Sequence, residues 1–116
     1  MNFFKGDNKS KHHDQVQEFL FEGEELHSTY GLMVDFVALT SHRVLFVDRS
    51  IMSKSRSVVV TIPFSKIEEI AIEKTGFLSF SNTIEIATKS GNHQLQFTKG
   101  SDVMGFYKEL SQRICA

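Results

Sequence analysis

The chain has 116 residues, of which 41% are hydrophobic, and its 13 basic and 14 acidic side chains leave a net charge of −1. This length suits one domain with one hydrophobic core. A charge balance near zero excludes the overall basic excess on which nucleic-acid binding usually depends, so we expect no nucleic-acid partner.

The composition also predicts a cellular location. Cys115 is the only cysteine and can form no disulfide within the chain. No stretch approaches the roughly 20 apolar residues of a membrane-spanning helix, and the first residues lack the basic and then apolar order of a signal peptide. We therefore expect a protein of the reducing cytoplasm.

Residues 1–13 are polar and show little apolar periodicity. We expect a flexible N-terminal tail there, followed by a single domain over residues 14–116. Three apolar residues between positions 16 and 20 lie at helical spacing, which predicts a short helix at the start of the domain.

From residue 24 to residue 98, short β-branched and aromatic runs alternate with turn residues, a pattern typical of an antiparallel barrel or sandwich. The segment 35–48 is apolar on both faces and would form a central hairpin covered on both sides. The predicted strands span about residues 24–30, 35–40, 43–48, 57–62, 67–73, 82–88 and 93–98.

One strand has a helical alternative. Residues 65–68, with the sequence SKIE, have the spacing of a helix capping box directly after Pro63. The β-branched Ile70 and Ile72 lie at strand spacing, however, and we favour a strand over residues 67–73.

The apolar period changes again at the end of the chain. Between Val103 and Ile114 the large apolar side chains share one helical face, and Ser101 or Asp102 would cap the start of this helix. Gly105 costs about 1 kcal/mol in a helix relative to alanine, which predicts close packing of the helix on the sheet.

Five segments in order resemble the bacterial pleckstrin-homology (PH) domain family, and the resemblance covers roughly residues 16–113. The most specific part is the spacing of Asp35-Phe36 and Thr40-x-x-Arg43 ahead of Phe46-Val47-Asp48. The five segments are Glu22 to Glu25, DFVALTSHRVLFVD from Asp35 to Asp48, Ile62 to Ile67, Glu73 to Gly76 and Phe97 to Gly100.

The resemblance implies a mainly β fold, in which a seven-stranded antiparallel PH-like barrel is capped by a C-terminal helix. It also implies a non-enzymatic domain that forms homo-oligomeric rings and whose ligand is generally unassigned. Eukaryotic relatives typically carry a tryptophan in the final helix. This chain has none, and Phe106 or Tyr107 would fill the same volume.

Lipid-binding PH domains surround the loop between their first two strands with lysine and arginine, because inositol phosphates need several charge-assisted hydrogen bonds. The corresponding residues 29–34 contain no basic side chain. Phosphoinositide binding in that manner is therefore disfavoured, and we expect this loop, with Leu32 and Met33, to pack on the barrel or on a neighbouring subunit.

A second apolar loop predicts self-association. Phe77, Leu78 and Phe80 fall in a predicted loop, where burial within the chain is hard to arrange, and exposed apolar clusters often mark interfaces. The alternative is that this loop folds back under the end of the barrel. We expect a homo-oligomer, with a ring as one form, that also binds a protein or peptide partner.

The loop at residues 49–56 mixes cations with apolar side chains, which suits an anionic membrane surface or an acidic partner. A solvated hairpin loop is the simpler interpretation, so peripheral membrane binding is an alternative function. The residues that would carry it are Arg49, Ile51, Met52, Lys54 and Arg56.

The sequence offers little for catalysis. None of the five histidines belongs to a metal-ligating motif, and Cys115 has no evident base beside it. Arg43 would pair with Asp35 across the central hairpin and fix its register. We expect no enzyme, no metal and no cofactor; a deep pocket around Glu69, Glu73 or His93 would favour an enzyme instead.

Overall fold

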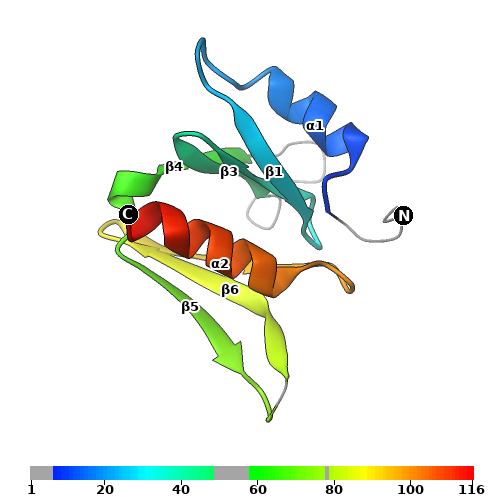
Figure 1. Ribbon diagram of the computed structural model, residues 1–116, viewed down its shortest axis with the longest axis vertical. Helices are drawn as coiled ribbons and strands as arrows, with labels where there is room; N and C mark the ends of the chain where they lie inside the picture. The colour runs from blue at the N-terminus through cyan, green and yellow to red at the C-terminus, as the bar shows by residue number, and fades with distance from the viewer. Residues whose placement is uncertain (1–6, 49–57, 78) are drawn as a thin grey trace.

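The fold consists of two antiparallel sheets and two helices (Figure 1). The computed structural model describes residues 7–48, 58–77 and 79–116. In these ranges, no helix is long and apolar enough to cross a membrane. The elements in chain order are α1 (Ser10–Gln17), β1 (Leu26–Gly31), β2 (Phe36–Thr40), β3 (Arg43–Asp48), β4 (Val58–Pro63), the 3-10 turn η1 (Phe64–Lys66), β5 (Glu69–Lys74), β6 (Phe80–Thr88), β7 (Gly91–Gln96) and α2 (Val103–Ile114).

All the predicted strands are present, and the mainly β fold is confirmed. The first four strands form one sheet in the order β1-β2-β3-β4, and the last three form a second sheet in the order β5-β6-β7. The two sheets meet where the end of β1 lies against the end of β7. There Leu32 forms a bridge with Phe97, and the Met33 N–H donates to the Gln96 carbonyl at 2.8 Å.

Helix α2 packs on the core at the opening between the two sheets (Figure 1). Its apolar face carries Phe106 and Leu110, which are fully buried. The Phe106 ring contacts Tyr30 of β1 and Phe97, with ring centroids 5.3 and 5.1 Å apart. The helix therefore ties the first sheet to the second.

The capping residue of α2 is Asp102, as predicted, because its Oδ1 accepts a hydrogen bond from the Gly105 N–H at 2.9 Å. The structure gives a further reason for the glycine. A Cβ atom at residue 105 would collide with the Asp102 carboxylate. Gly105 thus leaves room for the cap.

The central hairpin of β2 and β3 is covered on both faces, as predicted. Its inner face belongs to the main core. Its outer face forms a second cluster with Val16 of α1, in which Phe36, Ala38, Leu45 and Val47 are buried. Ser10 to His13, which we expected in the tail, form the first turn of α1.

The strand over residues 67–73 is confirmed with a later start. Pro63 is followed by the short 3-10 turn η1, which has no side-chain cap, and β5 begins at Glu69. Ile70 and Ile72 pack against the main core, so burial of the β-branched side chains favours the strand over the helical alternative.

Candidate functional site

The loop between β5 and β6 exposes two of the predicted interface residues. Phe77 is 86% exposed and Phe80 is 46% exposed. Thr75 and Gly76 both donate backbone N–H groups to the Ser79 carbonyl, at 2.9 and 3.3 Å, which closes a tight turn. The phenylalanines therefore project from an ordered hairpin end. Leu78 lies outside the described residues.

The turn between β1 and β2 separates the other two predicted interface residues. Met33 is 62% exposed, next to a partly exposed Val34. Leu32 is only 4% exposed and belongs to the main core. Of the two alternatives for this loop, Leu32 thus packs on the barrel of its own chain, where it forms the bridge with Phe97.

The loop proposed for a membrane surface cannot be placed, because residues 49–57 lie outside the described ranges. This applies to all of its candidate residues, which are Arg49, Ile51, Met52, Lys54 and Arg56.

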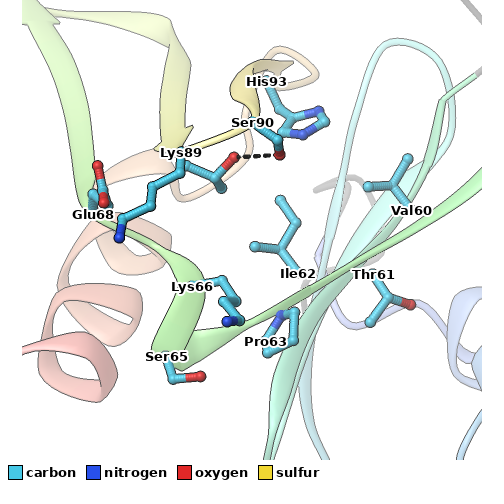
Figure 2. A pocket seen from close by; sticks show the side chains of 11 residues that line it. Val60, Thr61, Ile62, Pro63, Ser65, Lys66, Glu68, Lys89, Ser90 and His93 are labelled. Carbon is cyan, nitrogen blue, oxygen red and sulfur yellow. Dashed lines mark hydrogen bonds between the residues drawn. The ribbon is translucent and has the colours of Figure 1, made fainter.

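A groove with a cavity volume of about 400 Å³ lies between β4 and the turn that joins β6 to β7 (Figure 2). In Figure 2 the Ile62 side chain points from β4 into its centre. Two walls contribute lysines, Lys66 from η1 and Lys89 from the β6–β7 turn, and Glu68 is the one carboxylate in the lining. The full lining is Val60, Thr61, Ile62, Pro63, Ser65, Lys66, Glu68, Thr88, Lys89, Ser90 and His93.

The groove has an apolar centre and a polar rim. Its polar groups are the two ammonium groups, Glu68 and several hydroxyls, and the Thr88 and Ser90 hydroxyls lie 3.2 Å apart. His93 stacks edge to face on Phe46 with ring centroids 5.7 Å apart. Among the described residues, no three His, Cys, Asp or Glu side chains are grouped so that they could hold a metal ion. The groove is not predicted by the sequence, because its walls come from segments about 25 residues apart.

A smaller pocket, with a volume of about 280 Å³, lies beside the β1–β2 turn and has basic side chains in its lining. Lys9, Lys11 and His12 at the start of α1 line it together with Asp35 and Thr98. The turn itself has no basic residue, and the nearby cations come from a segment that we expected to be a tail. The lining of this pocket therefore contains both basic and acidic side chains.

His12 anchors the start of α1. It is 5% exposed, and its ring stacks on Phe36 with centroids 4.9 Å apart. Burial lowers the pKa of His12; Asp35 opposes this shift, and the two neighbouring lysines and His13 add to it. Its Nδ1 is buried without a hydrogen-bond partner among the described residues. The neutral imidazole is thus the form that fits this site.

Arg43 does not pair with Asp35, and that prediction was wrong. The hairpin register sets Val37 opposite Phe46 and Leu39 opposite Val44, so Arg43 lies at the turn and Asp35 at the far end of the hairpin. Arg43 instead binds Glu24, with Nε 2.8 Å from Oε2 and Nη2 2.8 Å from Oε1.

Glu24 accepts hydrogen bonds at both carboxylate oxygens. Besides Arg43, its oxygens accept from the Thr40 hydroxyl at 2.6 Å and from the Phe21 N–H at 3.1 Å. Burial alone would raise the pKa of Glu24, but these hydrogen bonds and the guanidinium charge lower it to about 2. The cluster holds the start of β1 against the β2–β3 turn and offers no open position to a ligand.

Glu109 on α2 also connects two elements of the fold through hydrogen bonds. Its Oε1 accepts from the Ser28 hydroxyl at 2.8 Å and from the Tyr30 hydroxyl at 2.9 Å. Burial and the Glu109 carboxylate raise the pKa of Tyr30. The tyrosine therefore stays protonated and fastens α2 to β1.

Comparisons with known proteins agree on one family. The family model described as bacterial PH domain matches residues 1–114. The uncharacterized protein YozO of Bacillus subtilis (strain 168) is 30% identical over 102 residues, which cover 88% of this chain and 89% of that protein.

Solved structures show the same fold at lower identity. The pleckstrin homology domain from Shewanella amazonensis SB2B superposes with a TM-score of 0.74 at 19% identity, covering 91% of this chain and 97% of that one. A DUF1696 family protein with a pleckstrin-homology domain from Shewanella loihica PV-4 gives a TM-score of 0.71 at 16% identity, covering 90% and 92%.

Proposed function

The chain belongs to the bacterial PH domain family, and from that premise we propose that it is a non-catalytic interaction module that associates with copies of itself and binds a protein or peptide partner. The observation that carries self-association is the exposed Phe77 with Phe80 beside it. A phenylalanine held in water on an ordered hairpin is costly unless another surface covers it.

The exposed apolar side chains also indicate the kind of assembly. Phe77 and Phe80 lie on the β5–β6 hairpin, whereas Met33 and Val34 lie on a different turn. A contact between two different patches is heterologous, and such contacts close into a ring when the rotation between copies allows it. A ring built from hairpin-to-turn contacts is the assembly that we propose.

The test is the mass of the protein in solution. We expect light scattering coupled to size-exclusion chromatography to show an oligomer, and Phe77→Asp with Phe80→Asp to shift it to the monomer. Phe19→Asp is the matched control, because Phe19 is also partly exposed but lies after α1. A wild-type monomer at high concentration would refute self-association, as would an oligomer that the double variant leaves intact.

A further inference from the structure

We propose that the outer edge of β4, which is unpaired among the described residues, is a docking site for an extended acidic peptide segment of another protein, which adds to the first sheet as a fifth strand beside the groove of Figure 2. This inference rests on the partner-binding half of the proposed function and is independent of self-association.

The strand register shows which backbone groups are available. The Phe64 N–H donates to the His42 carbonyl at 3.3 Å. In an antiparallel ladder every second residue bonds to its partner, so Ile62 and Val60 face β3. Val59 and Thr61 therefore point their N–H and C=O groups away from β3.

Two observations support this assignment. Pro63 occupies the next outward position, where a proline costs no ladder hydrogen bond. Within the described ranges, no backbone hydrogen bond to Val59 or Thr61 is present on that side. Unpaired strand edges are templates for another strand, and many peptide-binding domains use them in this way.

The groove lies directly against this edge. Residues 60–63 all line it, although successive side chains of a strand point to opposite faces. It is therefore the edge of β4, and not one face, that borders the cavity. Every second side chain of an added strand would enter the groove and meet Ile62, and a volume of about 400 Å³ is within the range of ligand pockets.

The charge of the lining selects an acidic occupant. Lys66 and Lys89 come from opposite walls, and Glu68 is the one opposing carboxylate. The outer face of the second sheet has the opposite character, because a shallow pocket there is lined by Glu73 and Glu85 without a cation. An extended segment that alternates aliphatic and acidic residues would contact the apolar centre of the groove with its aliphatic side chains. Its backbone would hydrogen-bond to the outer edge of β4, and its acidic side chains would pair with the lysines.

The probe is a fluorescein-labelled peptide of about six residues, the usual length of a strand, that alternates valine and glutamate. We expect saturable binding that weakens with added salt, and no binding of the same peptide with lysine in place of glutamate. Two N-methylated versions test strand addition, each methylated on the donors of one edge. One should bind about tenfold more weakly, and the other like the parent.

Variants of the protein test whether the peptide binds at the edge of β4. Among the backbone hydrogen-bonding groups, Thr61→Pro removes one outward N–H, whereas Thr61→Ala keeps it. Both variants lose the hydroxyl bond to Arg43. We expect the proline variant to bind about tenfold more weakly than the alanine variant. Lys66→Gln and Lys89→Gln should each weaken binding about threefold. Amide hydrogen exchange of the wild type should slow at Val59 and Thr61 when peptide binds.

Three results would overturn the proposal. The first is that the acidic peptide does not bind at about 1 mM. The second is that the lysine peptide binds as tightly as the acidic one. The third is that both N-methylated versions lose the same amount of affinity. The mass measured for Thr61→Pro separates this failure from that of the proposed function. If that variant loses assembly, the β4 edge joins subunits and the peptide site is refuted, whereas an unchanged oligomer without peptide binding refutes only the docking site.

Discussion

Arg43 and Glu24 form a two-pronged ion pair across 19 residues of sequence, with both N–O distances at 2.8 Å and the Glu24 side chain fully buried. Thr40 joins them through its hydroxyl. Glu24, Thr40 and Arg43 all belong to the sequence segments that carry the family resemblance. Thr40 and Arg43 of the most specific motif in the sequence therefore stabilise the fold through Glu24.

Removal of the Glu24 charge should destabilise the domain. Glu24→Gln keeps the size of the side chain but leaves the partly buried Arg43 without its counter-ion, which costs about 3 kcal/mol in the free energy of unfolding. Urea unfolding measures this cost. Glu25→Gln is the control, because Glu25 is exposed. Equal stability of the two variants would show that the ion pair contributes nothing.

The same carboxylate should make stability depend on acid. The pKa of Glu24 is about 2 in the folded chain, below its ordinary value of 4.5, so the folded state favours the ionised form. The stabilisation is complete above pH 4.5 and declines as the pH falls towards 2. We expect the stability difference between wild type and Glu24→Gln to shrink over this window. A difference that stays constant would contradict the lowered pKa.

His12 should make the docking of α1 sensitive to milder acid. Because the pKa of His12 is lowered from 6.5 by burial, the neutral ring favours the folded state, and its contribution declines as the pH falls below 6.5. His12→Phe keeps a ring against Phe36 and cannot titrate.

Hydrogen exchange of the α1 amides measures this effect. We expect the protection factors of these amides, which are corrected for the intrinsic exchange rate at each pH, to fall in the wild type between neutral pH and pH 5 and to stay constant in His12→Phe. His13→Gln controls for the neighbouring half-buried imidazole and should behave like the wild type. Loss of protection on acidification in all three proteins would show that His12 is not the cause.

The strands could be predicted because local alternation of apolar and polar residues reports directly on burial. Ile84 and Ile86, which alternate with Glu85, are both fully buried. The partner of Arg43 could not be predicted, because Glu24 precedes the hairpin and reaches it only through tertiary packing. Leu32 and Met33 are adjacent apolar residues, and only the bridge to Phe97 separates the buried one from the exposed one.

The groove beside β4 was beyond prediction for the same reason. Its lysines, Lys66 and Lys89, lie in separate turns and carry no motif. The strand that borders the groove was predicted, but whether its outer edge is paired depends on the order of strands in the sheet. The alternation of apolar and polar residues indicates which face of a strand is buried, but it does not indicate which strands lie beside it.

The last prediction concerns the start of α2, where Gly105 and Asp102 depend on each other. In the wild type, Gly105→Ala gains about 1 kcal/mol of helix propensity, but its Cβ displaces the capping carboxylate, and loss of a cap costs about 1 kcal/mol. The net change in stability should be close to zero. In an Asp102→Ala background the cap is already gone, so the same substitution should stabilise the domain by about 1 kcal/mol.

A double-mutant cycle measured by thermal or urea unfolding gives the coupling between the two positions. Ser111→Ala serves as a control in the last turn of the same helix, where the capping bond goes to the Ser111 backbone carbonyl, which the substitution keeps. Identical effects of Gly105→Ala in both backgrounds would show that the glycine does not serve the cap. In that case close packing of α2 on the sheet would again be the better reason for a glycine in a helix.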